Sequence, residues 1–182
     1  MSFQWVTGTL SMVVAISLAR ILLNLVTVYR SRFQTKMEPM PFVWMSCIFY
    51  SLLQFSWAIQ ELDVLIKQWS LPLFLSLFIL VILLFLSAAL ILPQQELTSE
   101  ESFHEEFKNN GSSAIFVLGL YELCTVLINW IFWSASPLSW LGIVNLTLAA
   151  LALSFLMVEN RSWQWLITII FVSLDYVTLS MA

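Results

Sequence analysis

The chain has 182 residues, of which 60% are hydrophobic and only 10% are charged. Soluble domains usually carry about 25% charged residues, so this composition indicates a membrane protein with several spans and leaves no room for a separate soluble domain. The formal net charge of −4 gives no reason to expect a nucleic-acid partner. The two cysteines, Cys47 and Cys124, both fall in apolar segments, which fits neither a disulfide framework nor a zinc site.

Six segments contain the roughly 20 mainly apolar residues that a membrane-spanning helix needs. They cover approximately residues 5–29, 41–61, 71–93, 113–133, 138–158 and 163–181. The first apolar run is too long for a signal peptide and lacks a basic start, so we expect it to remain as a span. The sequence therefore predicts an all-α bundle of six spans with short loops, forming a single transmembrane domain over residues 1–182.

The first span carries a polar stripe. This stripe consists of Ser17, Arg20, Asn24 and Thr27. Their spacing of three, four and three residues places them within about 80° of arc on one helical face. An arginine at membrane depth costs about 2.5–3.5 kcal/mol or more unless another group compensates for it. We therefore expect the stripe to face inward, with other helices packed around it.

The second span also has a polar face, whereas the third has none. By helical spacing, one face of the second span collects Cys47, Ser51, Gln54, Ala58 and Glu61. The third span is rich in Leu, Ile and Phe, and serine is its only polar residue type. We therefore expect the third span to lie against lipid.

Residues 98–110 form the only sizeable polar segment and predict a short amphipathic helix on the cytoplasmic side. Thr98 and Glu101 have the spacing of a capping box. Acidic residues crowd the first turns, Lys108 lies in the last turn, and Gly111 follows as a candidate stop. The segment thus has the start, charge order and end of a separate helix.

The apolar side of this short helix would be formed by Phe103 and Phe107, which are four residues apart. In one interpretation the helix is a solvated connector whose two rings rest on the bilayer surface. In the other it is a docking surface for a partner, with Glu105 and Glu106 beside the rings. Its acidity disfavours tight contact with anionic lipid.

The fourth and sixth spans contain carboxylates at membrane depth. Glu122, like Arg20, would lie roughly 13 Å from the cytoplasmic end of its span, and Asp175 roughly 18 Å. We expect Arg20 to pair with Glu122, with Asp175 as the second candidate. The predicted intramembrane polar cluster comprises Arg20, Asn24, Gln54, Glu122, Asn129 and Asp175. Such a cluster either fixes the register of the helices or binds an ion, a proton or a small polar ligand.

Lysine and arginine residues predict the orientation of the chain. The first, third and fifth loops contain Arg30, Arg32, Lys36, Lys108 and Arg161. The second loop has only Lys67, and the fourth has no basic residue. The first, third and fifth loops should therefore be cytoplasmic, with both termini outside.

Several chemistries are excluded by missing residues. His104 is the only histidine and lies in a loop, so a bis-histidine haem within one chain is excluded. No lysine lies in a span, which excludes a retinal Schiff base. Neither Cys-x-x-Cys nor His-Glu-x-x-His occurs, and no glycine-rich phosphate loop is present. We expect no catalytic residue, cofactor or metal, and the sequence disfavours an enzyme.

Three motifs resemble a loose group of small bacterial inner-membrane proteins of unknown activity. The first span contains Ser17-Leu-Ala-Arg20 and ends in Tyr29-Arg30. The second span contains Phe42-Val-Trp44 and Gln54-Phe-Ser-Trp57-Ala, and the third ends in Ala-Leu-Ile-Leu-Pro93. The resemblance implies a multi-span helical bundle in the bacterial inner membrane and implies no mechanism.

Three classes of function remain open. The first is a small transport or channel-like bundle that uses the intramembrane polar cluster. The alternative is a non-catalytic membrane subunit or scaffold that binds a partner through the acidic loop. Membrane lipids are expected partners in each case. Six short spans bury little polar surface within one chain, which is compatible with a homo-oligomer or with a membrane-protein partner. An enzyme acting on lipid ranks last, because no nucleophile–base pair or metal pattern occurs.

Overall fold

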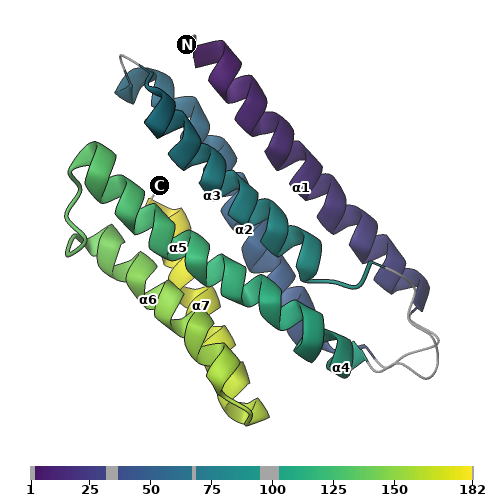
Figure 1. The fold of residues 1–182 in the computed structure, drawn as a ribbon. Helices are drawn as coiled ribbons and strands as arrows, with labels where there is room; N and C mark the ends of the chain where they lie inside the picture. Colours follow the sequence, from purple (N-terminus) through teal and green to yellow (C-terminus); the bar gives the residue numbers. More distant parts are fainter. Residues whose placement is uncertain (1–2, 32–36, 67–68, 95–102, 182) are drawn as a thin grey trace.

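The computed structural model describes residues 3–31, 37–66, 69–94 and 103–181, and these residues contain helices but no strands. The long helices are α1 (Phe3–Ser31), α2 (Pro39–Leu65), α3 (Leu71–Leu90), α5 (Ser112–Trp133), α6 (Trp140–Met157) and α7 (Arg161–Met181). A short α4 (Phe103–Glu106) and a π-helical turn, η1 (Phe107–Gly111), lead directly into α5. The helices pack side by side as a bundle, which confirms the predicted fold class (Figure 1).

Five helical segments are long and apolar enough to cross a membrane. They are Phe3–Ser31, Pro39–Leu62, Leu71–Leu90, Phe103–Trp133 and Trp140–Met157. The 21-residue α7 is not among them. The first five predicted spans are therefore confirmed as membrane-capable helices, and a sixth span at 163–181 stays a prediction.

Serine residues mark the starts of two helices. Ser70 begins α3, where its hydroxyl accepts a hydrogen bond from the Leu73 backbone N–H at 3.4 Å. Ser139 begins α6 in the same way, with the Gly142 N–H at 3.2 Å. Such side chains satisfy backbone N–H groups that have no partner within the helix.

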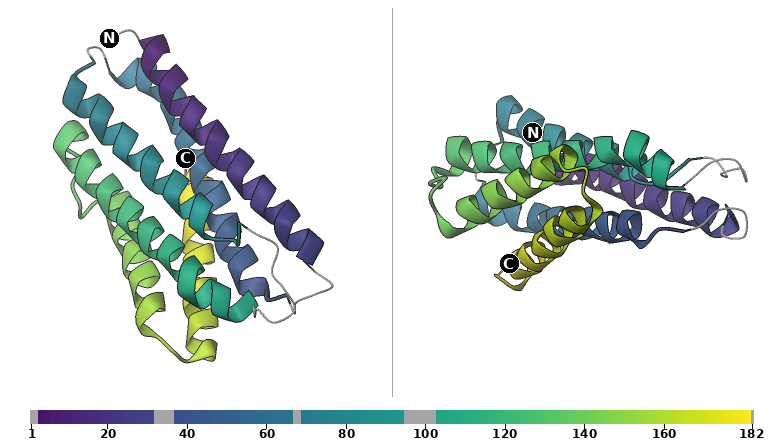
Figure 2. Two further views of the ribbon diagram at one scale, coloured as in Figure 1. Left: turned by 45° about the vertical axis from the view of Figure 1, so that its right-hand side comes forward. Right: turned by 90° about the horizontal axis from the view of Figure 1, so that it is seen from below.

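The strongly apolar α3 lies between α1 and α5 and also contacts α2 (Figures 1 and 2). Ser87 on α3 is fully buried and donates a hydrogen bond to the Ala114 carbonyl oxygen of α5 at 2.8 Å. The third span therefore packs against other helices on one face, while apolar side chains such as Leu75 and Ile79 stay exposed on the other, so its contact with lipid remains a prediction. A helix that is apolar all round fits either a lipid-facing or a central position, so the missing polar stripe did not distinguish them.

The helix α7 is joined to the bundle through α6 and α2. Trp44 of α2 packs between Phe155 of α6 and Phe171 of α7, with ring centroids 5.2 and 4.7 Å away. All three rings are almost completely buried. Figure 2 shows α7 inclined to the other helices, so this aromatic cluster fixes a helix that otherwise stands apart from the bundle.

The segment that precedes α5 is not a separate surface helix. Gly111 has φ −64°, a right-handed helical value, and the helix continues through it instead of stopping. Phe103 and Phe107 are only 3% and 7% exposed. Phe103 stacks on Phe42, and Phe107 packs edge-on against Phe155. The predicted rings on the bilayer surface are therefore wrong, and residues 98–102 lie outside the described residues.

Candidate functional site

The inward face of α1 differs from the predicted stripe at its edges. Its centre is formed by the buried residues Ser17, Ile21 and Asn24. Arg20 lies at the border and is half-buried. Thr27, at the same border, donates its hydroxyl to the Leu23 carbonyl oxygen of its own helix at 3.1 Å. Half of the predicted stripe therefore faces inward.

Arg20 forms no ion pair with Glu122, with Asp175 or with any other residue that the structure describes. The predicted pair is therefore wrong. The cause is the order of the helices, because α1 packs against α3 and α2, whereas Glu122 belongs to α5 on the other side of α3 (Figure 1).

Asn24 links two helices instead of joining a central polar cluster. Its Nδ2 donates a hydrogen bond to the Leu92 carbonyl oxygen at 3.3 Å, and the side chain is 2% exposed. This carbonyl group follows the end of α3, where backbone acceptors lack partners within the helix. Asn129 is half-buried on α5 and contacts neither this link nor the pocket described below.

Three of the predicted residues do come together, on α2, α5 and α7. Gln54 Nε2 donates to Thr178 Oγ1 at 3.4 Å, and this hydroxyl donates to the Asp175 backbone carbonyl oxygen at 2.6 Å. Asp175 and Glu122 are 7% and 6% exposed. Their carboxyl groups are close enough for their charges to interact. The core of the predicted cluster is thus Gln54, Glu122 and Asp175.

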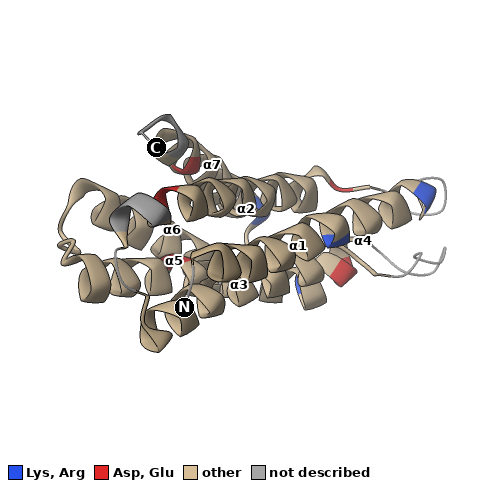
Figure 3. Cartoon of the chain, turned by 90° about the horizontal axis from the view of Figure 1, so that it is seen from above, with Lys and Arg blue, Asp and Glu red and all other residues tan. Residues whose placement is uncertain are grey.

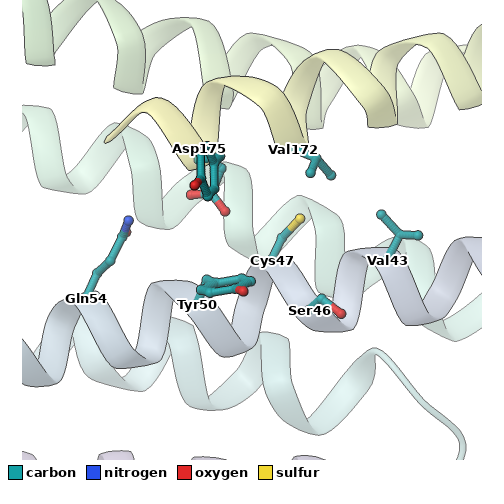
Figure 4. Close-up of a pocket in the computed structure, with 8 residues that line it drawn as sticks. Val43, Ser46, Cys47, Tyr50, Gln54, Val172 and Asp175 are labelled. Atoms are coloured by element: carbon teal, nitrogen blue, oxygen red, sulfur yellow. The ribbon is translucent and has the colours of Figure 1, made fainter. Parts of the chain in front are cut away.

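A pocket of about 160 Å³ lies between α2 and α7 beside this core. Its lining consists of Val43, Ser46, Cys47, Tyr50, Gln54, Val172, Asp175 and Tyr176. Figure 4 shows Asp175 on α7 facing Cys47, Tyr50 and Gln54 on α2. Asp175 is the one charged residue among those that line it.

The Asp175 carboxylate accepts no hydrogen bond and forms no ion pair with a residue that the structure describes. Burying such an acceptor without a partner is costly, so a carboxylate that borders a cavity is a ready site for a donor or a cation. The pocket therefore favours ligands that carry a positive charge or a proton.

A second polar group joins the start of α2, α4 and the start of α7. Glu38 accepts a hydrogen bond from Arg161 Nη1 at 2.8 Å and lies 3.1 Å from His104 Nδ1. Burial raises the pKa of Glu38, but the hydrogen bonds from Arg161 and His104 outweigh this effect and hold the pKa below its ordinary value.

This Glu38–His104–Arg161 group was not predicted, because its members are far apart in the sequence and follow no local motif. The only indication in the sequence was the distribution of lysine and arginine among the loops, because it predicts that all three residues lie in loops on the same side of the membrane. Charged residues are sparse along the bundle, so such a group is easily recognised once the fold is known (Figure 3).

Metal-binding geometry is not found in the part of the chain that the structure describes. No group of three or more His, Cys, Asp or Glu side chains could hold a metal ion there. Cys47 is 2% exposed and has no histidine beside it in the pocket.

No protein family model matches the chain, and no curated protein or solved structure is significantly similar to it.

Proposed function

We propose that the protein is a small transport protein of the bacterial inner membrane that binds a small organic cation between α2 and α7. The observation that carries this proposal is the buried Asp175 carboxylate, which borders the pocket without a partner among the described residues. Ionisable groups among membrane-spanning helices are expensive to bury and usually mark ligand, ion or proton sites.

The size and lining of the pocket support a compact ligand. A cavity of about 150 Å³ holds a molecule the size of benzene, and the pocket between α2 and α7 measures about 160 Å³. Tyr50 and Tyr176 contribute aromatic rings beside the carboxylate. Aromatic faces and a carboxylate together attract quaternary or alkylated ammonium groups. A trimethylammonium group matches both the volume and the chemistry.

The position of α7 supports transport rather than static binding. This helix contributes Asp175 to the pocket, is inclined to the bundle and contacts only α6 and α2 extensively. A ligand site shared between two helices opens and closes when one helix moves against the other. The scaffold alternative has less support, because the burial of Phe103 and Phe107 removes the apolar half of the predicted docking surface.

The test uses choline and its uncharged isostere 3,3-dimethyl-1-butanol. Titration calorimetry of the detergent-purified protein should show choline binding that weakens at least tenfold in Asp175→Asn. The control Ser173→Ala, at an exposed position of α7 outside the pocket, should bind as the wild type does. Choline uptake into proteoliposomes should be lost in the Asp175→Asn variant.

Three outcomes would contradict the proposal. One is absence of choline binding to the folded wild-type protein. Another is equal binding of the uncharged isostere, which would show that the carboxylate does not select the ligand. The third is unchanged binding in a folded Asp175→Asn variant.

A further inference from the structure

A larger cavity lies at the other polar group, where the α4–η1 segment meets the end of α6 and the start of α7. Its volume is about 540 Å³. One side is apolar and includes Phe107 and Phe155. The other side is polar and includes Lys108, Arg161 and Gln164. The cavity thus has two chemically different halves.

The cavity lies at the level where apolar helices end. The apolar α6 ends at Met157, the polar start of α7 follows at Arg161, and α5 begins at Ser112. Ser112 and Arg161 both line the cavity. In a membrane protein this level corresponds to the boundary between acyl chains and lipid headgroups.

Positive charge is available inside this cavity. The Lys108 ammonium forms no ion pair with a residue that the structure describes. Arg161 contacts Glu38 and His104 through Nη1, and its other nitrogens have no described partner. Glu159 is the one carboxylate among the lining residues. Glu38 neutralises much of the charge of Arg161 at the edge of the cavity, so Lys108 is the cation that lacks an acidic partner among the described residues, and Arg161 keeps free N–H groups for an acceptor.

We propose that this cavity binds an anionic phospholipid, with the phosphate between Lys108 and Arg161 and an acyl chain against Phe107 and Phe155. Guanidinium groups bind phosphate through paired N–H groups, and an ammonium group adds a compact charge. Basic pockets between helices on the cytoplasmic side are typical sites for anionic headgroups. The apolar half favours a lipid over a free anion, because inorganic phosphate has nothing to bury there.

Glu38 has a positioning role in this site. Its carboxylate is 2.8 Å from Arg161 Nη1 and 3.1 Å from His104 Nδ1, so it holds both side chains at the edge of the cavity. The phosphate would contact the remaining N–H groups of Arg161 without breaking this ion pair. Lys108 is the cleaner position for a test, since its removal leaves the Glu38 contacts intact.

The experiment is native mass spectrometry of the detergent-purified full chain with phosphatidylglycerol and phosphatidylcholine of equal acyl length. We expect at least threefold more bound phosphatidylglycerol than phosphatidylcholine in the wild type. This preference should be lost in Lys108→Gln and kept in Lys108→Arg. The control Arg30→Gln removes a cation that does not line the cavity and should keep the preference.

Added inorganic phosphate distinguishes the two sources of the anion. Phosphate at millimolar concentration should not displace phosphatidylglycerol, and displacement would show that the site takes a free anion. Equal binding of the two lipids would overturn the proposal, as would an unchanged preference in Lys108→Gln. Choline binding should be unaffected by Lys108→Gln, which separates this proposal from the transport function.

Discussion

The hydrogen bond between Asn24 and the Leu92 carbonyl oxygen joins α1 to the end of α3. Leu92 is 2% exposed, and Pro93 follows it, so the chain cannot continue the helix there. A carbonyl group that is buried at a helix end needs a donor from elsewhere in the fold. Asn24 supplies this donor across 68 positions of the sequence.

Replacing Asn24 by leucine should destabilise the protein by about 1–3 kcal/mol, because the buried Leu92 carbonyl group loses its partner. Thermal unfolding in detergent measures this loss. The matched control is Thr27→Val, whose hydroxyl bonds only to its own helix and whose removal should have little effect. Equal stability of the two variants would contradict the role of Asn24.

At the residue scale, sequence spacing predicted a polar face but not its centre. Ser17 and Asn24 face inward as predicted, whereas Arg20 lies about 60° from Ser17 at the edge of the buried face. An arc of about 80° spans both the centre and the border of a helix face. Only the neighbouring helices decide which side of the arc is buried.

The π-helical turn η1 depends on a glycine. A Cβ atom at Gly111 would overlap the ring of Phe107, which lies one turn earlier and is 7% exposed. The ring cannot swing aside, because it packs against Phe155 in the core. The glycine therefore provides space for a side chain and does not terminate the helix.

Gly111→Ala should destabilise the protein by about 1–3 kcal/mol, the usual effect of overpacking. Gly8→Ala is the control, since nothing lies within 4 Å of the added methyl group and alanine is the better helix former by about 1 kcal/mol. Thermal unfolding of the two variants should therefore shift in opposite directions. A stabilised Gly111→Ala variant would be inconsistent with this packing.

At the element scale, the existence of the helices was predictable and their neighbours were not. Apolar runs of the right length located α1, α2, α3, α5 and α6, because a membrane-capable helix needs only composition and length. The central position of α3 depends on contacts with α1 and α5, which are distant in sequence. The same limit applied to Glu122, whose carboxyl group lies near Asp175 of α7 and forms no ion pair with Arg20 of α1.

The orientation of the whole molecule is a separate prediction, made from the basic residues of alternate loops. Ser136 lies in the connection before α6 and Ser162 in the first turn of α7, so the two residues flank α6, and both are exposed. Each should be replaced by cysteine in a variant that lacks Cys47 and Cys124. An impermeant maleimide should label position 136 in intact cells and position 162 only after permeabilisation.

Permeabilised cells provide the control for this experiment, because both positions should then be labelled. The reverse pattern in intact cells would place the Glu38–His104–Arg161 group outside. It would also remove the argument for a cytoplasmic anionic lipid beside Lys108. The labelling result does not depend on whether α7 crosses the membrane, since both positions flank α6.

The ion pair between Glu38 and Arg161 lies at one end of α7, and Asp175 lies near the other. Phe171, which is buried against Trp44 of α2, lies one turn before Asp175. The helix is therefore held at two places, the ion pair at its start and this ring, which are roughly 15 Å apart at 1.5 Å per residue. Because the ring is only one turn from Asp175, the width of the pocket between α2 and α7 depends more on the fit of this aromatic side chain than on the ion pair at the far end.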